Sequence, residues 1–220
     1  MNGFRREIAR RVFAKELNAA THTIRGEGER SPVYVLTPLG LRCNRVFVVG
    51  ALLDKEEVKP ESGIWRIRVA DPTGSFVGYV GRFQPEALES LLDIEPPVLV
   101  ALTAKVRVFE GATRTFVSLR PEIINLADPD ARDYWVVETA KATVERIKAV
   151  EEEANEDARL AREIYNPDLE DYKRAVREAL LRLKEEYEVF EEVEEEEEEY
   201  EELEELVFEE EEFDLRDLLE

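Results

Sequence analysis

Cationic and aromatic side chains alternate with apolar ones along several segments in the middle of the chain. Successive side chains of a β-strand point to opposite faces, so the apolar residues of each segment indicate which residues face outward. In residues 64–69, Arg66 and Arg68 lie on the face opposite Ile67. Residues 98–109 and 114–124 place cations and a phenylalanine outward in the same way. The candidate set is Arg66, Arg68, Phe76, Tyr79, Lys105, Arg107, Phe109, Arg114, Phe116 and Arg120.

These residue types have the chemistry needed to hold a single nucleic-acid strand. Cations contact the phosphates, and exposed base faces stack on aromatic rings. Phe76 and Tyr79 have opposite parity in their segment, so at most one of them belongs to the core. The alternative is that the arginines are ordinary solvated surface and the aromatics are core. Two neighbouring strands with the same outward mixture of cations and a phenylalanine favour binding.

Five predicted strands and one helix carry these residues. In order, they are strands over 45–50, 64–69 and 75–80, a helix over 84–94, and strands over 98–109 and 114–124. Turn residues Asp71-Pro72-Thr73-Gly74 separate the second and third strands, and a hairpin turn over 110–113 joins the last two. Three strands, a helix and two strands is the layout of an OB fold, a small, partly open barrel that binds oligonucleotides or oligosaccharides. We therefore predict a mainly β chain with flanking helices, built on a five-stranded OB-fold barrel over residues 31–127.

Helices are predicted before and after the barrel in the sequence. Residues 4–19 have apolar side chains at helical spacing, so residues 1–30 are expected to be an N-terminal helix and loop. Residues 128–190 are predicted to form a helical arm, in which Asn166-Pro167 ends one helix and caps the next. The first helix of the arm has a stripe too apolar to face water: Tyr134, Val137, Ala140, Val144 and Ile147. This stripe packs either within the chain or against a partner protein.

Acidic residues are concentrated at one end of the chain. Residues 1–150 hold 22 Lys and Arg against 20 Asp and Glu, whereas residues 151–220 hold 8 against 32. A dense charge block repels itself and stays solvated, so residues 191–220 are predicted to be a disordered acidic tail. The tail is similar to those of bacterial single-strand-binding proteins, in which partner proteins recognise a short apolar tip. We therefore expect its glutamates to compete with nucleic acid for the cationic face. We also expect its last apolar residues to bind other proteins: Phe213, Leu215, Leu218 and Leu219.

The sequence carries no pattern for catalysis or for a cofactor. The single cysteine, Cys43, excludes an internal disulfide, and the single histidine, His22, removes the usual zinc spacings. Among so many glutamates, no carboxylate pair stands out as catalytic. No run approaches the roughly 18 apolar residues of a membrane span, and the N-terminus lacks the apolar run of a signal peptide. The sequence thus predicts a soluble, cytoplasmic, non-enzymatic protein with no metal, no cofactor and no membrane partner.

Several strings over residues 5–150 together resemble the archaeal replication protein A-associated protein family, single-OB-fold companions of archaeal single-strand-binding proteins. They are Arg11-Val12-Phe13-Ala14, Tyr34-Val35-Leu36-Thr37-Pro38-Leu39-Gly40, Asn44-Arg45-Val46-Phe47-Val48-Val49-Gly50, Arg68-Val69-Ala70-Asp71-Pro72-Thr73-Gly74-Ser75-Phe76, Leu119-Arg120-Pro121-Glu122 and Arg132-Asp133-Tyr134-Trp135. The resemblance implies an accessory subunit that acts on single-stranded DNA in replication, recombination or repair. It also implies a larger replication protein A-type OB-fold subunit as partner, docked on the helix that carries Tyr134, Val137, Val144 and Ile147.

Two other functions remain open from the sequence. One is an acidic chaperone or DNA mimic that binds basic proteins through residues 191–220, with the barrel as a scaffold. The other is an OB module that binds structured RNA. Competition among single-stranded DNA, duplex DNA and RNA separates all three.

Overall fold

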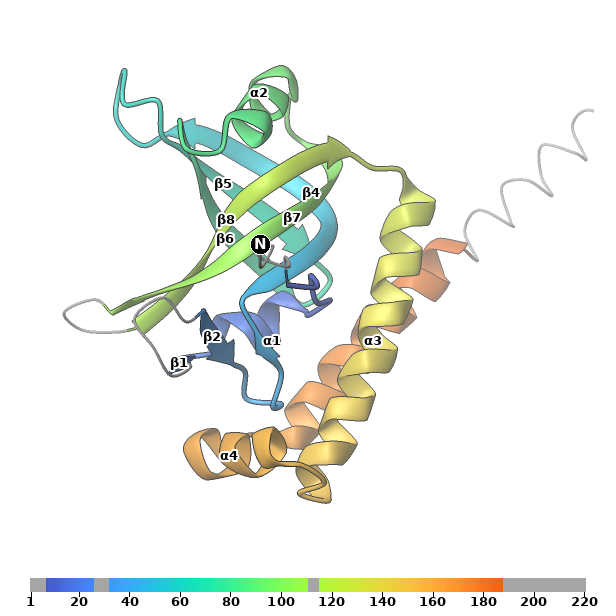
Figure 1. The fold of residues 1–220 in the computed structure, drawn as a ribbon. Helices are drawn as coiled ribbons and strands as arrows, with labels where there is room; N and C mark the ends of the chain where they lie inside the picture. Colours follow the sequence, from blue (N-terminus) through green and yellow to red (C-terminus); the bar gives the residue numbers. More distant parts are fainter. Residues whose placement is uncertain (1–6, 26–31, 111–114, 188–220) are drawn as a thin grey trace, which may run out of the picture. The chain divides into compact units, whose positions relative to one another are not determined.

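The computed structural model describes residues 7–25, 32–110 and 115–187. The chain divides into two compact units, residues 1–180 and 181–220. The first unit holds a β-barrel, a small second sheet and the helices that follow the barrel (Figure 1). In the second unit, the described residues 181–187 are helical.

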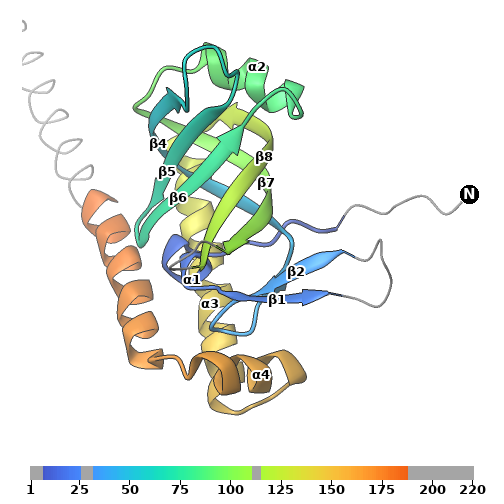
Figure 2. The same cartoon turned by 90° about the vertical axis from the view of Figure 1, so that its left-hand side faces the viewer.

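A closed barrel of five strands forms the centre of the first unit, in the order β4-β5-β6-β8-β7. Its elements are β4 Arg45–Glu57, β5 Trp65–Asp71, β6 Gly74–Val80, α2 Pro85–Asp93, β7 Val98–Glu110 and β8 Thr115–Leu126. The predicted succession of three strands, a helix and two strands is therefore confirmed. Antiparallel pairs join all neighbours except β6 and β8, which meet in parallel at Gly78 and Leu119 and close the barrel. The helix α2 lies at one end of the barrel (Figures 1 and 2).

The inward and outward faces of the strands follow the predicted alternation. Ile67, Leu102 and Leu119 are buried in the barrel, whereas Arg66 and Arg107 are exposed. Phe76 is only 1% exposed and lies opposite Val69, so of the two third-strand aromatics it is the core residue. The prediction that Phe76 contacts a ligand is therefore wrong, because a buried ring has no face on which a base can stack.

Gly50 lies within the first barrel strand, which is longer than predicted. The sequence suggests that this strand ends at Gly50, but β4 continues to Glu57. Near Gly50, β4 passes from pairing with β7 to pairing with β5. A Cβ at this position would lie 2.2 Å from the backbone oxygen of Ala70, so the two strands approach this closely only because residue 50 has no side chain.

The N-terminal region differs from the predicted helix over residues 4–19. Residues 7–13 form no helix or strand apart from one backbone bridge at Arg10, and helix α1 spans only Ala14–Asn18. The bridge pairs Arg10 with the start of β4: the Arg10 N–H donates to the Arg45 carbonyl and the Phe47 N–H donates to the Arg10 carbonyl, both at 2.9 Å. Pairing with an available strand edge thus overrides the helical spacing. A small antiparallel sheet that was not predicted follows: β1 His22–Arg25, β2 Val33–Leu36 and β3 Arg42–Cys43.

The turn residues after β5 hold α1 against the barrel. The Asp71 carboxylate accepts from the Ala14 N–H at 2.6 Å, and the Thr73 hydroxyl accepts from the Lys15 N–H at 3.1 Å. Asp71 also accepts from the N–H groups of Thr73 and Gly74, which fixes the turn. Burial raises the pKa of Asp71, and these donors oppose the rise. The turn motif is thus an N-terminal cap for a distant helix.

The helical arm has one more break than predicted. Its helices are α3 Pro129–Glu151, α4 Glu156–Tyr165 and a helix over 169–187. The side chain of Asn155 caps α4 by accepting from the Ala158 N–H at 2.8 Å. Asn166 is the left-handed residue that ends α4, and Asp168 accepts from the Asp171 N–H at the start of the next helix. The predicted capping role of Asn166 is therefore wrong, because a left-handed residue ends one helix rather than starting another.

Helix α3 packs within the first unit along much of its length. The Trp135 indole N–H donates to the Phe47 carbonyl at 2.8 Å, and its ring meets Phe13 edge to face at 5.7 Å. The buried Glu16 carboxylate receives two hydrogen bonds from Arg146, which ties α1 to α3. Ile147 packs with Leu39, Tyr172 and Leu169 in one apolar cluster. The prediction that Ile147 binds a partner is therefore wrong, because this side chain is buried inside the chain.

Candidate nucleic-acid interface

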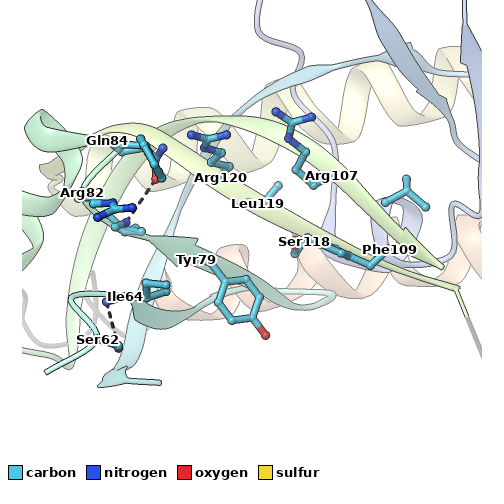
Figure 3. Close-up of a pocket in the computed structure, with 14 residues that line it drawn as sticks. Ser62, Ile64, Tyr79, Arg82, Gln84, Arg107, Phe109, Ser118, Leu119 and Arg120 are labelled. Carbon is cyan, nitrogen blue, oxygen red and sulfur yellow. Dashed lines mark hydrogen bonds between the residues drawn. The ribbon is translucent and has the colours of Figure 1, made fainter. Parts of the chain in front are cut away.

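A cleft of about 740 Å³ opens over the seam where β6 meets β8 (Figure 3). It is lined by the loop before β5, the end of β6 with the residues that follow it, and the facing strands β7 and β8. Tyr79, Arg107, Phe109 and Arg120, all predicted from the sequence, line this cleft. The barrel thus brings residues from three strands to one concave surface.

The described lining of the cleft has cations and no acidic residue. Arg82, Arg107 and Arg120 contribute three guanidinium groups, and Figure 3 shows the last two extending in the same direction. Beside them, Lys105 lies directly opposite Arg120 in the β7–β8 register. Within the described residues, no carboxylate forms a salt bridge with any of these four cations. Like charges placed opposite each other destabilise a sheet, so this arrangement favours an anionic ligand.

Two other predicted cations have a different environment. Arg66 lies opposite Glu56 with an ion pair of 2.8 Å, and Arg68 lies opposite Asp54 with an ion pair of 2.6 Å. Both arginines are on the outer face of the barrel, but neither lines the cleft. Their charges are already balanced by cross-strand neighbours.

Aromatic rings stand at two ends of the cleft. Phe109 and Phe116 lie opposite each other on β7 and β8, with their rings stacked at 5.4 Å and exposed to solvent. Beyond β6, the Phe83 ring is 73% exposed and lies 4.9 Å from the Arg82 guanidinium. Tyr79 contributes a fourth ring from β6. Solvent-exposed rings beside guanidinium groups that have no carboxylate partner among the described residues match the chemistry that holds a single strand.

Sequence reasoning missed the cleft residues that lie between predicted elements. Arg82 and Phe83 stand between the third strand and the helix, so strand alternation could not assign them to a face. Ile64 also lines the cleft; it is the first residue of the predicted strand over 64–69, on the same outward face as Arg66 and Arg68, but it was not among the candidates. The signal available in the sequence is an arginine followed by an aromatic directly after a strand.

Some predicted site residues lie outside the described residues. Arg114 belongs to residues 111–114, which follow β7 and precede β8 in the sequence. The proposed C-terminal tip lies in residues 188–220: Phe213, Leu215, Leu218 and Leu219. The predictions for these five residues stay predictions.

The barrel is similar to a known structure at low sequence identity. A chain of the S. pombe Stn1–Ten1 complex matches with a TM-score of 0.51 and 11% identity, over 63% of this chain and 93% of that chain. The fold is an OB barrel. A chain of a replication protein A heterotrimer bound to single-stranded DNA matches with a TM-score of 0.43 and 12% identity, over 64% and 98% of the two chains. The S. cerevisiae mitochondrial single-stranded DNA binding protein Rim1 has a TM-score of 0.31 and 21% identity, over 39% and 94%. No family model and no curated protein sequence matches.

In an OB fold, the face of the second and third strands and the loops beside it form the usual oligonucleotide surface. The corresponding strands here are β5 and β6, and the cleft uses the loop before β5 and the end of β6. The cationic residues of the cleft come mainly from β7 and β8, which are the fourth and fifth strands. The charged part of this OB barrel is therefore displaced from β5 toward the β7–β8 ribbon.

The predicted partner surface on α3 is divided by the fold. Tyr134 is 63% exposed and Val144 is partly exposed, whereas Val137 is half-buried. Ile147 and Ala140 face the interior. What remains outward is an interrupted stripe in which Lys141 separates Val137 from Val144.

The described residues offer little material for other chemistry. No three His, Cys, Asp or Glu side chains among them are grouped to hold a metal ion. Cys43 is buried, and burial raises the pKa of its thiol to about 12, so the reactive thiolate is scarce. No described helix is both long enough and apolar enough to cross a membrane.

Proposed function

We propose that this chain is a non-enzymatic accessory subunit of a replication protein A-type complex that binds single-stranded DNA in replication, recombination or repair. The observation that carries the proposal is the β7–β8 ribbon, where Lys105 lies opposite Arg120 and Arg107 lies two residues further along β7 on the same face. These cations lie in or beside a cleft whose described lining has no acid. The family resemblance of residues 5–150 supports the same function.

In this proposal, phosphates contact Arg107 and Arg120, while bases stack on the Phe109–Phe116 pair and on Phe83. Stacking needs an unpaired base, because a duplex hides the base faces between neighbouring pairs. The cleft therefore favours single strands over duplexes. Base stacking and phosphate contacts do not depend on base identity, so we expect weak sequence preference.

The partner in this proposal is a larger OB-fold subunit, which docks on the outward residues Val137 and Val144 of α3. The similar S. pombe structure is itself a complex of two proteins. Val144→Asp should release the partner, while the thermal midpoint of the isolated chain stays unchanged because this side chain is partly exposed.

A competition experiment on the full chain tests the proposed function. Labelled single-stranded DNA is challenged with unlabelled single-stranded DNA, duplex DNA and structured RNA over a range of salt concentrations. We expect single-stranded DNA to compete best. The logarithm of affinity should fall with the logarithm of salt, with a slope of roughly −0.7 for each phosphate contact. Preferential competition by structured RNA, or no DNA binding at low salt, contradicts the proposal.

A further inference from the structure

A row of outward cations leads out of the cleft and across the barrel. Arg120 lines the cleft, Lys105 lies opposite it on β7, and Arg45 lies opposite Lys105 on β4. Residues in register on neighbouring strands project to the same face. Arg45 is neutralised by Glu122 at 2.6 Å, whereas Lys105 forms no salt bridge within the described chain. The cationic surface thus extends beyond the cleft.

A second aromatic cluster lies on the same face of β4 and β7, beside the row of cations. Phe47 lies opposite Thr103, two residues from the cationic row, which corresponds to about 7 Å along a strand. The Arg11 guanidinium carbon lies 5.7 Å from the centre of the Phe47 ring and 5.9 Å from that of Tyr134. Phe47, Arg11 and Tyr134 therefore form one cluster of a cation with two rings, adjacent to the row that leaves the cleft.

The outer member of this cluster is open to a ligand. Tyr134 is 63% exposed although its ring lies beside a cation. The Arg11 Nε is buried and has no hydrogen-bond partner. Glu138 and Glu122 border the route, but each is already paired, Glu138 with Lys141 at 2.7 Å and Glu122 with Arg45. This surface of cations and rings is continuous with a cationic cleft. Its chemistry therefore favours a nucleic acid as ligand over the apolar surface of a partner protein.

We propose that a single DNA strand leaves the cleft past Arg120, crosses Lys105 and reaches the Arg11–Tyr134 cluster, where an unpaired base stacks on Tyr134. This inference rests on the proposed function and adds a second contact region for longer strands. It assigns Tyr134, which the sequence pattern suggested for a partner protein, to the nucleic acid, and leaves Val144 for the partner.

The test compares two lengths of oligothymidylate on the full chain, because a single OB fold covers about 4–16 nucleotides. One probe of about 5 nucleotides fills the cleft alone, and one of about 16 nucleotides reaches the second region. Tyr134→Ala should weaken binding of the long probe about 5-fold or more and leave the short probe unchanged. Tyr134→Phe should restore the long-probe affinity, because it keeps the ring.

Ile164→Ala is the matched control, since Ile164 is an exposed residue of α4 that belongs to neither contact region. It should leave both probe affinities unchanged. The second contact region is overturned if Tyr134→Ala affects both probes equally or neither, or if it releases only a protein partner. If wild-type protein binds neither probe at low salt, it is the proposed function itself that fails.

Discussion

Two ribbons of the same barrel show the same sequence pattern and opposite electrostatics. On β4–β5, the outward cations Arg66 and Arg68 each lie opposite a carboxylate. On β7–β8, Lys105 lies opposite Arg120, and within the described residues neither has an acidic partner. An outward cation on a strand is therefore not in itself evidence of a binding site. The residue opposite it decides whether its charge is already balanced or available to a ligand.

The comparison also indicates that the outward charge pairs of the β7–β8 ribbon contribute less to the stability of the fold than those of the β4–β5 ribbon. Cross-strand pairs of opposite charge contribute about 0.2–1 kcal/mol relative to neutral pairs, and like charges have the opposite effect. These pairs are exposed, which places the gain at β4–β5 toward the lower end of that range. A small loss of stability on β7–β8 is the expected accompaniment of a free cationic surface.

Reversing the charge of the two cleft arginines gives the largest expected effect. The double variant Arg107→Glu with Arg120→Glu should lose about 100-fold or more in affinity for single-stranded DNA. Two hydrogen bonds to phosphate, each of about 1.5–3 kcal/mol, are replaced by repulsion. Fluorescence anisotropy at low salt measures the loss. The matched control is Arg66→Glu with Arg68→Glu, which should retain affinity within about 3-fold while lowering the thermal midpoint. An equal loss of affinity in the control would contradict the distinction between the ribbons.

Two phenylalanines should separate binding from stability. Phe116→Ala removes an exposed stacking ring and should weaken binding by about 1–3 kcal/mol, or about 5- to 150-fold, with little change in unfolding. Phe76→Ala removes a buried ring and should cost about 3–5 kcal/mol of unfolding free energy. Oligonucleotide titration and urea denaturation measure the two quantities. The assignment of the faces is wrong if Phe116→Ala destabilises the fold as strongly as Phe76→Ala.

Lys105→Glu should change stability and binding in opposite directions. The new carboxylate faces Arg120 and converts a like-charge pair into an ion pair, which should raise the unfolding free energy by about 0.2–1 kcal/mol. The same change puts a negative charge beside the cleft, so single-strand affinity should fall several-fold, and less at high salt because exposed charges are screened. Urea denaturation and a salt series provide the two measurements. Loss of both stability and affinity would show that Lys105 has a structural role.

Asp54→Asn should have the smallest effect. It frees Arg68 on the β4–β5 ribbon and should reduce the unfolding free energy by no more than about 1 kcal/mol, because the pair is exposed. DNA affinity should stay unchanged, since Arg68 does not line the cleft. A clear gain in affinity would mean that the DNA surface includes β5.

Strand alternation predicted much of the candidate site because it depends only on local geometry. The outward positions of Lys105, Arg107, Phe109 and Phe116 follow from the buried residues between them. The pairing of Arg66 and Arg68 with acidic residues could not be predicted, because the first strand was expected to end at Gly50, before Asp54 and Glu56. A glycine that permits two strands to approach closely has the same appearance in a sequence as one that ends a strand. Arg82 and Phe83 were missed because residues between elements have no periodicity.

The sequence by itself determined the succession of the barrel elements, the inward and outward faces of the barrel strands and the separation of acidic residues toward one end. These properties depend on neighbours along the chain. Only the tertiary structure decided that Arg10 pairs with β4, that Ile147 is buried while Tyr134 is exposed, and that Lys105 faces Arg120. Each of those outcomes depends on which distant segment lies opposite. Register and packing between segments are set by the whole barrel, so local spacing does not contain them.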